Sequence, residues 1–455
     1  MVLDTPALLG LVIYAIVISW LSWLLFRMLF PPHASPATLH IKDYGEDRRK
    51  IPYVAPCAIP EHIVCKEKYI LNSRGMLLHT CEWWPQHVGD KPRALVVQCC
   101  GFADSNTFLP MTRSIRLAQQ GFAVVGMDPE GHGRSDGLHA YVPSFAAIVE
   151  DYWQWFTRDI RSNSAYAGLP TFLLGESMGG NVVVQLLLRD GLEQTNYFQG
   201  AIMLAPMLEV SPRMKPPEAL VTFLRHLAPF LPTLPVTPTK DLLSKAFRRA
   251  EVLAMAQKAP YGYRLKPRLG TALQLLEATE LVTQRASEVQ HPYLLLQGDS
   301  DVVTCPETVK VSKRKRSLRA GDGPCQGCSG FLYCVRETGL ARHAQDSCPS
   351  LSRSLPFPGR YLQVFHAKSG SREKELKLYE GMWHSLLSGE LEENIETVYR
   401  DIFAWLDRRL SPEEDEKRPG RGQQGGNSKG ILVQDGSRDG EARRRSGRRT
   451  GEAMD

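Results

Sequence analysis

The sequence lacks the features that mark several broad classes of protein. Its ten cysteines show no obvious disulfide framework, and reduced thiols are typical of a domain that faces the cytosol. The formal net charge is only +6, and much of the positive charge lies in residues 313–320 and 437–450. Charge runs of this kind are usually solvated, so we do not expect the folded part of the chain to bind nucleic acid.

Two segments have no periodic apolar pattern. Residues 410–455 are rich in Gly, Arg, Glu and Ser and have few large apolar residues, which predicts a disordered tail. Residues 311–363 also lack periodicity, and so long an irregular loop is unusual inside a compact domain. We therefore interpret 311–363 as an irregular insertion.

The beginning of the sequence lacks charge. Residues 7–26 contain no charged side chain, and twenty apolar residues are enough for a helix to span a bilayer. Trp20 and Trp23 suit the membrane interface, and the basic residues that follow place the rest of the chain on the cytosolic side. A cleaved signal peptide is the alternative, but no Lys or Arg precedes the apolar run. We predict a single-pass transmembrane anchor at 1–30 and a linker at 31–58.

Beyond the linker, short apolar runs alternate with segments of helical periodicity. Six of the runs have the length and composition of buried strands. They are residues 94–100, 122–127, 171–174, 201–205, 293–297 and 375–379. This alternation predicts an α/β fold with a mainly parallel sheet and helices on both faces.

Residues 206–290 differ, because proline-broken helical patterns follow one another there without a strand run. A helical insertion between two core strands is expected to form a cap over the carboxyl edge of the sheet, where such folds bind ligands. The apolar stretch 217–235 should pack on the core and in part line an entrance for an apolar substrate. The cap divides the core into residues 59–205 and residues 291–310 with 364–409.

The strongest motif is a G-x-S-x-G sequence centred on Ser177, directly between an apolar strand and a helical pattern. In this context the serine occupies a strained strand-to-helix turn, and Gly175 and Gly179 allow the backbones to approach. The backbone N–H of Met178 then points towards a developing oxyanion. The second donor is expected from the loop after strand 94–100, at the backbone N–H of Phe102.

Chain order predicts the partners of Ser177, because an acid and then a histidine follow the serine in folds with this turn. Asp299 and Asp301 both follow strand 293–297. We favour Asp301 as the acid and assign Asp299 to a turn within the loop. His384 lies in a turn after the last strand, where it can take the proton of the serine while the carboxylate fixes the imidazole tautomer.

These motifs resemble those of the plant-type monoacylglycerol lipases, a group with lysophospholipase-like and caffeoylshikimate esterase-like members. The resemblance is carried by GESMGG at 175–180, DPEGHGRSDGLHAYVPSF at 128–145, KPRLGTALQLLEAT at 266–279, the run at 298–304 and KLYEGMWHSLLSGE at 377–390. It covers roughly residues 60–310 and 364–409. It implies an α/β-hydrolase fold and hydrolysis of a lipid ester, a monoacylglycerol, with no metal and no cofactor. The alternatives are a lysophospholipase, a caffeoylshikimate-type esterase and a catalytically silent binding module.

The sequence departs from the pattern of this family at three places. Cys100-Gly101 replaces the usual His-Gly before the oxyanion loop, a change that leaves the backbone donors intact. Thr304-Cys305-Pro306 replaces Thr-Asp-Pro after the acid. The third departure is the insertion at 311–363, which interrupts a segment that the family keeps short.

The ends of the insertion suggest its origin. Joining Lys310 to Val364 restores the short helix and strand of the family. Every codon for Val311 begins with GT, and Gln363 can be encoded by CAG, so the segment begins and ends as an intron does. We interpret the segment as retained intron sequence, with a genuine insertion as the alternative. A zinc knuckle is a further alternative, with weak support from a single CxxC. Its ligands would be Cys325, Cys328, Cys334 and Cys348.

Overall fold

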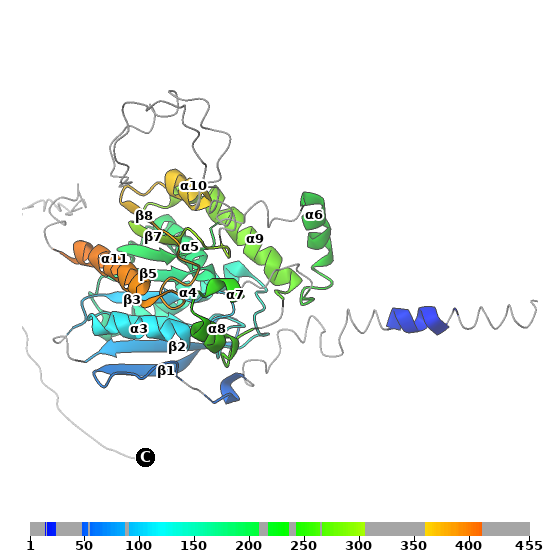
Figure 1. Cartoon of the computed structure of the whole chain (residues 1–455), viewed down its shortest axis with the longest axis horizontal. Coiled ribbons are helices and arrows are strands. Elements are labelled where there is room, and N and C mark those ends of the chain that lie inside the picture. The colour runs from blue at the N-terminus through cyan, green and yellow to red at the C-terminus, as the bar shows by residue number, and fades with distance from the viewer. Residues whose placement is uncertain are drawn as a thin grey trace, which may run out of the picture. The chain divides into compact units, whose positions relative to one another are not determined.

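An eight-stranded sheet forms the centre of the fold (Figure 1). The computed structural model describes residues 14, 16–23, 48–52, 55–86, 91–208, 217–235, 243–263, 266–304 and 360–411. In the order in which they pair, the strands are β1 (Ile63–Leu71), β2 (Leu77–Pro85), β4 (Ala123–Met127), β3 (Leu95–Cys99), β5 (Thr171–Glu176), β6 (Gly200–Leu204), β7 (Tyr293–Gly298) and β8 (Lys374–Tyr379).

The sheet is mainly parallel, as the sequence predicts. The pairs β1–β2 and β2–β4 are antiparallel, and the other five pairs are parallel. Every residue of β3, β4 and β6 is buried, because strands of a parallel sheet are covered on both faces. This double burial explains why these strands are continuous apolar runs in the sequence.

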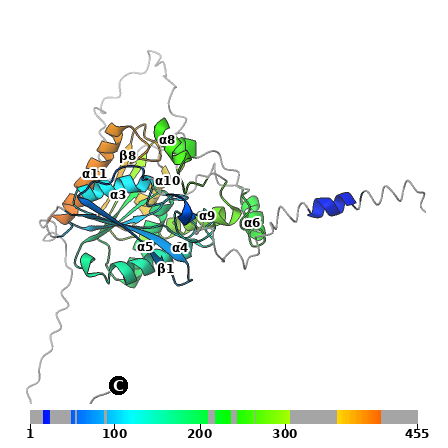
Figure 2. The ribbon, with the colours of Figure 1, turned by 90° about the horizontal axis from the view of Figure 1, so that it is seen from below.

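Helices cover both faces of the sheet (Figures 1 and 2). On one face, Leu95, Val97 and Cys99 pack against α4 (Phe145–Trp155), α5 (Met178–Glu193) and α10 (Arg360–Lys368). On the other face, Val96 packs among residues of α3 (Leu109–Gln119) and α11 (Glu392–Leu410). Successive side chains of a strand point to opposite faces, so β3 contributes to both cores. The fold is that of an α/β-hydrolase.

Four α-helices occupy the described residues between β6 and β7, and no strand interrupts them. They are α6 (Glu218–Leu227), α7 (Leu243–Ala246), α8 (Ala250–Gln257) and α9 (Leu269–Gln284). Two contacts locate them: the N–H of Ser385 donates to the carbonyl of Ala246 at 3.0 Å, and the N–H of Val142 donates to the Thr271 hydroxyl at 3.0 Å. The helical segment therefore lies beyond the carboxyl ends of the parallel strands.

The apolar stretch 217–235 is divided between packing and exposure. Val221 is buried against Leu269 and Leu276 of α9. In contrast, Phe223 and Phe230 are 60% and 70% exposed. Packing therefore accounts for only part of this stretch.

Several predictions fall on residues that the structure does not describe. These are most of the anchor at 1–30, the four cysteines of the alternative zinc site and residues 412–455 of the tail. Within the described ranges, no helix combines the length and the apolar character needed to cross a membrane.

Part of the predicted linker makes specific contacts with the fold. Arg48 is buried, and its Nε donates to the carbonyl of Gly133 at 2.8 Å while its Nη2 donates to the carbonyl of Gly137 at 3.0 Å. Arg49 forms an ion pair of 2.6 Å with Asp136. The residues around Arg48 thus bind the loop that follows β4, and a shortened chain needs them.

The last residues of the predicted insertion belong to helix α10, which begins at Arg360. Leu362 is 4% exposed and lies in the same apolar core as Phe365. If 311–363 is removed, the joined sequence puts Val309 at the helical position of Leu362. An apolar side chain then remains at the buried position.

We expect a chain without residues 311–363 to fold cooperatively. Its free energy of unfolding in urea should fall by about 1 kcal/mol, because Val309 is smaller than Leu362 by one methylene group. The matched control is Val309→Asp in the shortened chain, which buries an unpaired carboxylate and should be far less stable. Loss of cooperative unfolding in the shortened chain would show that the segment is part of the fold.

Candidate active site

Ser177 lies at a sharp turn between β5 and α5. Its backbone has φ 56° and ψ −119°, a region that residues with a Cβ rarely adopt. The N–H of Ser177 donates to the carbonyl of Leu204 at 3.0 Å, and its own carbonyl accepts from the N–H groups of Gly180 and Met207. These hydrogen bonds hold the turn on both sides of the serine.

The two glycines of the motif are required by close backbone contacts. A Cβ at Gly175 would lie 2.3 Å from the carbonyl oxygen of Gly179, and a Cβ at Gly179 would lie 2.2 Å from the carbonyl oxygen of Cys99. Both distances are far below van der Waals contact. Glycine at these positions lets α5 start directly against the ends of β3 and β5.

His384 lies in the loop after β8, next to a fully buried carboxylate. Its Nδ1 is 2.8 Å from Oδ2 of Asp301. Asp299 instead accepts hydrogen bonds from the Gly381 N–H, at 2.7 Å, and the Ser300 hydroxyl, at 3.0 Å. Of the two candidate acids, Asp301 is therefore the one that contacts the imidazole, while Asp299 braces the loop that leads to His384.

Asp301 is held in place by neighbours that also stabilise its charge. Oδ1 accepts from the N–H of Val303 at 2.7 Å, and Oδ2 accepts from the Thr304 hydroxyl at 2.6 Å and from Gln297 Nε2 at 2.8 Å. Burial alone would raise the pKa of this carboxyl. The charge of His384 and these hydrogen bonds outweigh burial and lower the pKa of Asp301 to about 2.

The pKa of His384 is raised above its usual value. Burial opposes protonation of the ring, but the charge and hydrogen bond of Asp301 outweigh it. The charge of Glu176 also raises this pKa. A histidine of raised pKa can accept a proton and hold it through an intermediate.

The loop after β3 lies against the serine turn. A Cβ at Gly101 would be 3.9 Å from Cβ of Ser177 and 3.6 Å from the carbonyl oxygen of Glu176. Phe102 follows in this loop, and Met178 is the first residue of α5. Met178 is therefore directly next to Ser177, and Phe102 follows the glycine that approaches it. The role of both residues as oxyanion donors stays a prediction.

A buried polar chain behind the serine turn was missed at the sequence level. Arg113 of α3 donates to Glu176 at 2.7 Å and to Gln98 at 2.7 Å. Gln98 donates in turn to Asn106 at 2.7 Å. One signal could have pointed to this series of polar contacts, namely the presence of a glutamine, Gln98, within the apolar run 94–100.

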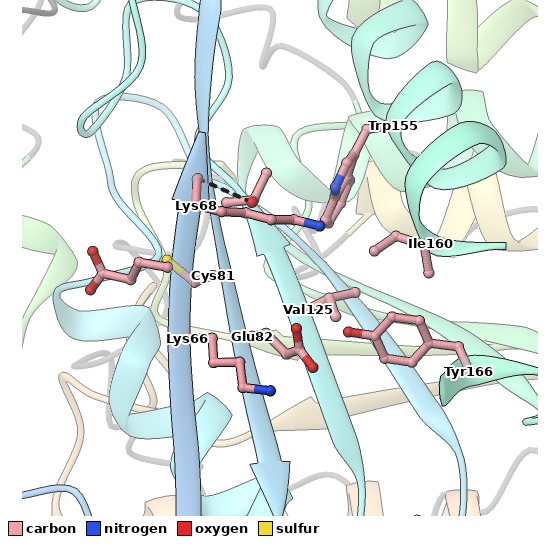
Figure 3. Close-up of a pocket in the computed structure, with 10 residues that line it drawn as sticks. Lys66, Lys68, Cys81, Glu82, Val125, Trp155, Ile160 and Tyr166 are labelled. Atoms are coloured by element: carbon pink, nitrogen blue, oxygen red, sulfur yellow. Dashed lines mark hydrogen bonds between the residues drawn. The ribbon is translucent and has the colours of Figure 1, made fainter. Parts of the chain in front are cut away.

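A cavity of about 340 Å³ lies elsewhere on the sheet (Figure 3). Lys66, Lys68 and Glu82 line it from β1 and β2, opposite Trp155 and Tyr166. No candidate catalytic residue is among its lining residues. The cavity is therefore separate from the candidate active site.

The contact between His384 and Asp301 can be tested by proton NMR. The ring C–H signals of His384 should titrate above 6.5, the usual imidazole pKa, and Asp301→Asn should lower that pKa because the favourable charge is lost. His132 supplies a reference in the same spectra, since burial lowers its pKa to about 4. Asp299→Asn is the matched control and should change the pKa of His384 much less. An equal effect of the two substitutions would contradict the assignment of the acid.

The chain matches known proteins over most of its described fold. A family model, Hydrolase_4, described as serine aminopeptidase S33, matches residues 90–319, which are 230 of the 455 residues. Caffeoylshikimate esterase of Arabidopsis thaliana is 27% identical over 310 residues, which are 68% of this chain and 76% of that protein. Monoglyceride lipase of Homo sapiens is 25% identical over 363 residues, which are 78% of this chain and 96% of that protein.

A solved structure agrees in fold. The structure of a soluble variant of monoglyceride lipase from Saccharomyces cerevisiae, in complex with a substrate analogue, aligns with a TM-score of 0.56 and 18% identity, covering 79% of this chain and 99% of that one. The family model covers half of the sequence, and the serine motif of this sequence lies on the strand-to-helix turn described above. The chain therefore belongs to the serine aminopeptidase S33 family of α/β-hydrolases and is a serine ester hydrolase.

Proposed function

We propose that the chain hydrolyses monoacylglycerols to a fatty acid and glycerol through an acyl-enzyme on Ser177. The observation that carries this mechanism is the buried pair of His384 and Asp301, joined at 2.8 Å, in loops that follow strands of the same sheet edge as Ser177. The substrate class is supported by relatives named monoglyceride lipase, including the human protein, of which the chain matches 96%.

The proposed reaction follows from the positions of these residues. His384 takes the proton of the Ser177 hydroxyl as the oxygen attacks the ester carbonyl. Asp301 holds the tautomer in which Nδ1 carries a proton, and it stabilises the imidazolium that forms. The N–H groups of Phe102 and Met178 donate to the oxyanion. His384 then protonates the leaving glycerol, and water releases the fatty acid by the reverse sequence.

A caffeoylshikimate-type esterase or a lysophospholipase is the second candidate. The Arabidopsis thaliana relative named caffeoylshikimate esterase has slightly higher identity than the human lipase but covers a smaller part of both chains. The exposed Phe223 of helix α6 and the exposed Phe230, which follows this helix, favour a lipid over a soluble phenolic ester. A silent binding module would not require the strained serine turn and the buried ion pair together.

Substitution of Ser177 and of Asp301 should distinguish a catalytic chain from a silent binding module. Ser177→Ala should abolish labelling by a fluorophosphonate and lower turnover of monoacylglycerol by roughly 10⁴–10⁶-fold, because the three residues act as a unit. Asp301→Asn should lower turnover by about 10⁴-fold through the wrong imidazole tautomer.

The matched control is Asp299→Asn, which weakens a loop contact without touching the imidazole and should retain most of the turnover. Parallel assays with monoacylglycerol, lysophospholipid and caffeoylshikimate rank the candidate substrates. Normal turnover by Ser177→Ala would contradict the mechanism, and turnover restricted to caffeoylshikimate would contradict the substrate class.

We also propose that residues 1–30 anchor the chain in a membrane as a single pass, with the catalytic domain in the cytosol. The proposal is supported by the uncharged run 7–26 and by the large apolar side chains exposed on its described helical part. Those side chains are Tyr14, Ile16, Val17, Ile18, Trp20, Leu21 and Trp23.

Extraction of membranes at alkaline pH tests the anchor. The full chain should stay in the membrane pellet in carbonate, whereas a chain that begins at residue 45 should be released and active. The start at 45 keeps Arg48, whose loss should destabilise the fold by about 1.5–3 kcal/mol because it donates to buried carbonyls. A full chain that carbonate releases, or one recovered in secreted form without its first residues, would contradict the anchor.

A further inference from the structure

A buried carboxylate holds the loop that carries Phe102. Asp128 follows β4 and is fully buried. Its Oδ1 accepts from the backbone N–H of Asn106 at 2.8 Å, and its Oδ2 accepts from the Ser105 hydroxyl at 3.1 Å. At the other end of the loop, the thiol of Cys100 lies 3.7 Å from Oδ1. One carboxylate therefore binds the loop on both sides of Phe102.

The loop needs such contacts because its backbone is strained. Ala103 has φ 59°, in the left-handed region that disfavours residues with a Cβ. Strained backbone persists only where the surrounding structure holds it. The contacts of Cys100 and Ser105 with Asp128 lie on either side of Ala103 and supply that hold.

His79 of β2 provides the positive charge that pairs with this carboxylate. Its Nδ1 lies 3.1 Å from Oδ2 of Asp128, its Nε2 lies 3.0 Å from Oε2 of Glu67, and its side chain is fully buried. Burial opposes protonation of the ring, but the hydrogen bonds to the two carboxylates raise the pKa of His79 to about 9. Burial would raise the pKa of Asp128, but the hydrogen bond and charge of His79 outweigh it and lower that pKa to about 2. Both groups are therefore charged at neutral pH.

The other titratable groups around His79 keep the same protonation state as the pH rises from 7 to 9. Cys81, 3.8 Å from Nδ1, and Tyr69, whose ring centre is 5.2 Å away, both have pKa values raised by burial and stay neutral. Arg134 stays positive and binds Glu67 at 2.6 Å. His79 is the member of this group that loses its charge first.

We propose that Asp128, with His79 as its cation, is a positioning residue for the reaction and directs the N–H of Phe102 towards the oxyanion formed at Ser177. This inference rests on the proposed ester hydrolysis. Deprotonation of His79 leaves the buried carboxylate of Asp128 without this cation, whereas Glu67, which is exposed, keeps its ion pair with Arg134. The loop therefore loosens at alkaline pH.

The direction of the pH dependence follows from the pKa of His79. Its value in the folded chain lies above the unfolded value of about 6.5. The stabilisation is therefore fully present below about pH 6.5 and is lost as the pH rises through about 9. We expect kcat to fall over the same alkaline range.

The test measures kcat and KM for monoacylglycerol between pH 6 and 10 in the His79→Gln variant. We expect kcat to fall by about tenfold with little change in KM, because a displaced oxyanion donor affects the transition state more than substrate binding. The decrease of kcat centred near pH 9 should disappear. Ala103→Gly in the same variant should restore part of kcat, since glycine adopts φ 59° without strain.

The matched control is His291→Gln. His291, which precedes β7, lies 2.7 Å from the buried carboxylate of Asp190 near the end of α5. This variant should lose stability but keep kcat and its alkaline decrease. The proposal is overturned if His79→Gln keeps the wild-type kcat and pH profile, or if it loses activity only in proportion to unfolded protein, as His291→Gln does.

Two further measurements cover failure of the main variant or of the proposed reaction. If His79→Gln does not fold, Ser105→Ala serves as the milder variant, because it removes a single contact with Asp128. It should lower kcat to a smaller extent, and Ala103→Gly should again restore part of kcat. An unchanged kcat in Ser105→Ala overturns the proposal. If the wild type neither hydrolyses esters nor reacts with fluorophosphonate, the proposed function fails, and NMR then tests whether His79 serves as the cation of Asp128. Titration of His79 near pH 9, shifted down by Asp128→Asn, supports it, whereas titration at or below 6.5 overturns it.

Discussion

The backbone of Ser177 is held at φ 56° because hydrogen bonds on both sides of the serine fix the turn between β5 and α5. Gly175 and Gly179 allow β5 and α5 to meet at distances that any side chain would prevent. Such a conformation costs about 1–3 kcal/mol. Burial of β5 and of most of α5 in the two cores offsets this cost. The position of the serine hydroxyl, of the loop after β3 and of the start of α5 all depend on this turn.

Two buried carboxylates at the edge of the sheet each raise the pKa of a neighbouring histidine. Asp301 is one carboxylate beside His384, and it raises the pKa of that ring while leaving it able to exchange a proton. Asp128 and Glu67 together surround His79 and raise its pKa to about 9. The number of carboxylates in direct contact with the ring, one for His384 and two for His79, thus separates a histidine suited to proton transfer from one that serves as a fixed cation.

The sequence predicted the parts of the fold whose signals are local. Doubly buried strands are continuous apolar runs, and the serine motif has its strand and helix on either side, so both could be recognised from a few residues. Asp301 and His384 were predicted from chain order together with their positions after the last two strands. The contacts of His79 with Asp128, and of Arg113 with Glu176, join residues 49 and 63 positions apart. No local pattern encodes such pairs, because they depend on how the strands and helices are brought together. The docking of Arg48 within the predicted linker was missed for the same reason.

The proposed mechanism requires that the acyl group of the substrate bind covalently to Ser177 during turnover. Rapid acid quenching of the enzyme during turnover of a monoacylglycerol, followed by mass spectrometry of its peptides, tests this most directly. If Ser177 carries the acyl group, the peptide containing Ser177 gains the mass of the acyl group less one hydrogen, and the other peptides do not. Turnover accompanied by an acyl group on a different residue would contradict it.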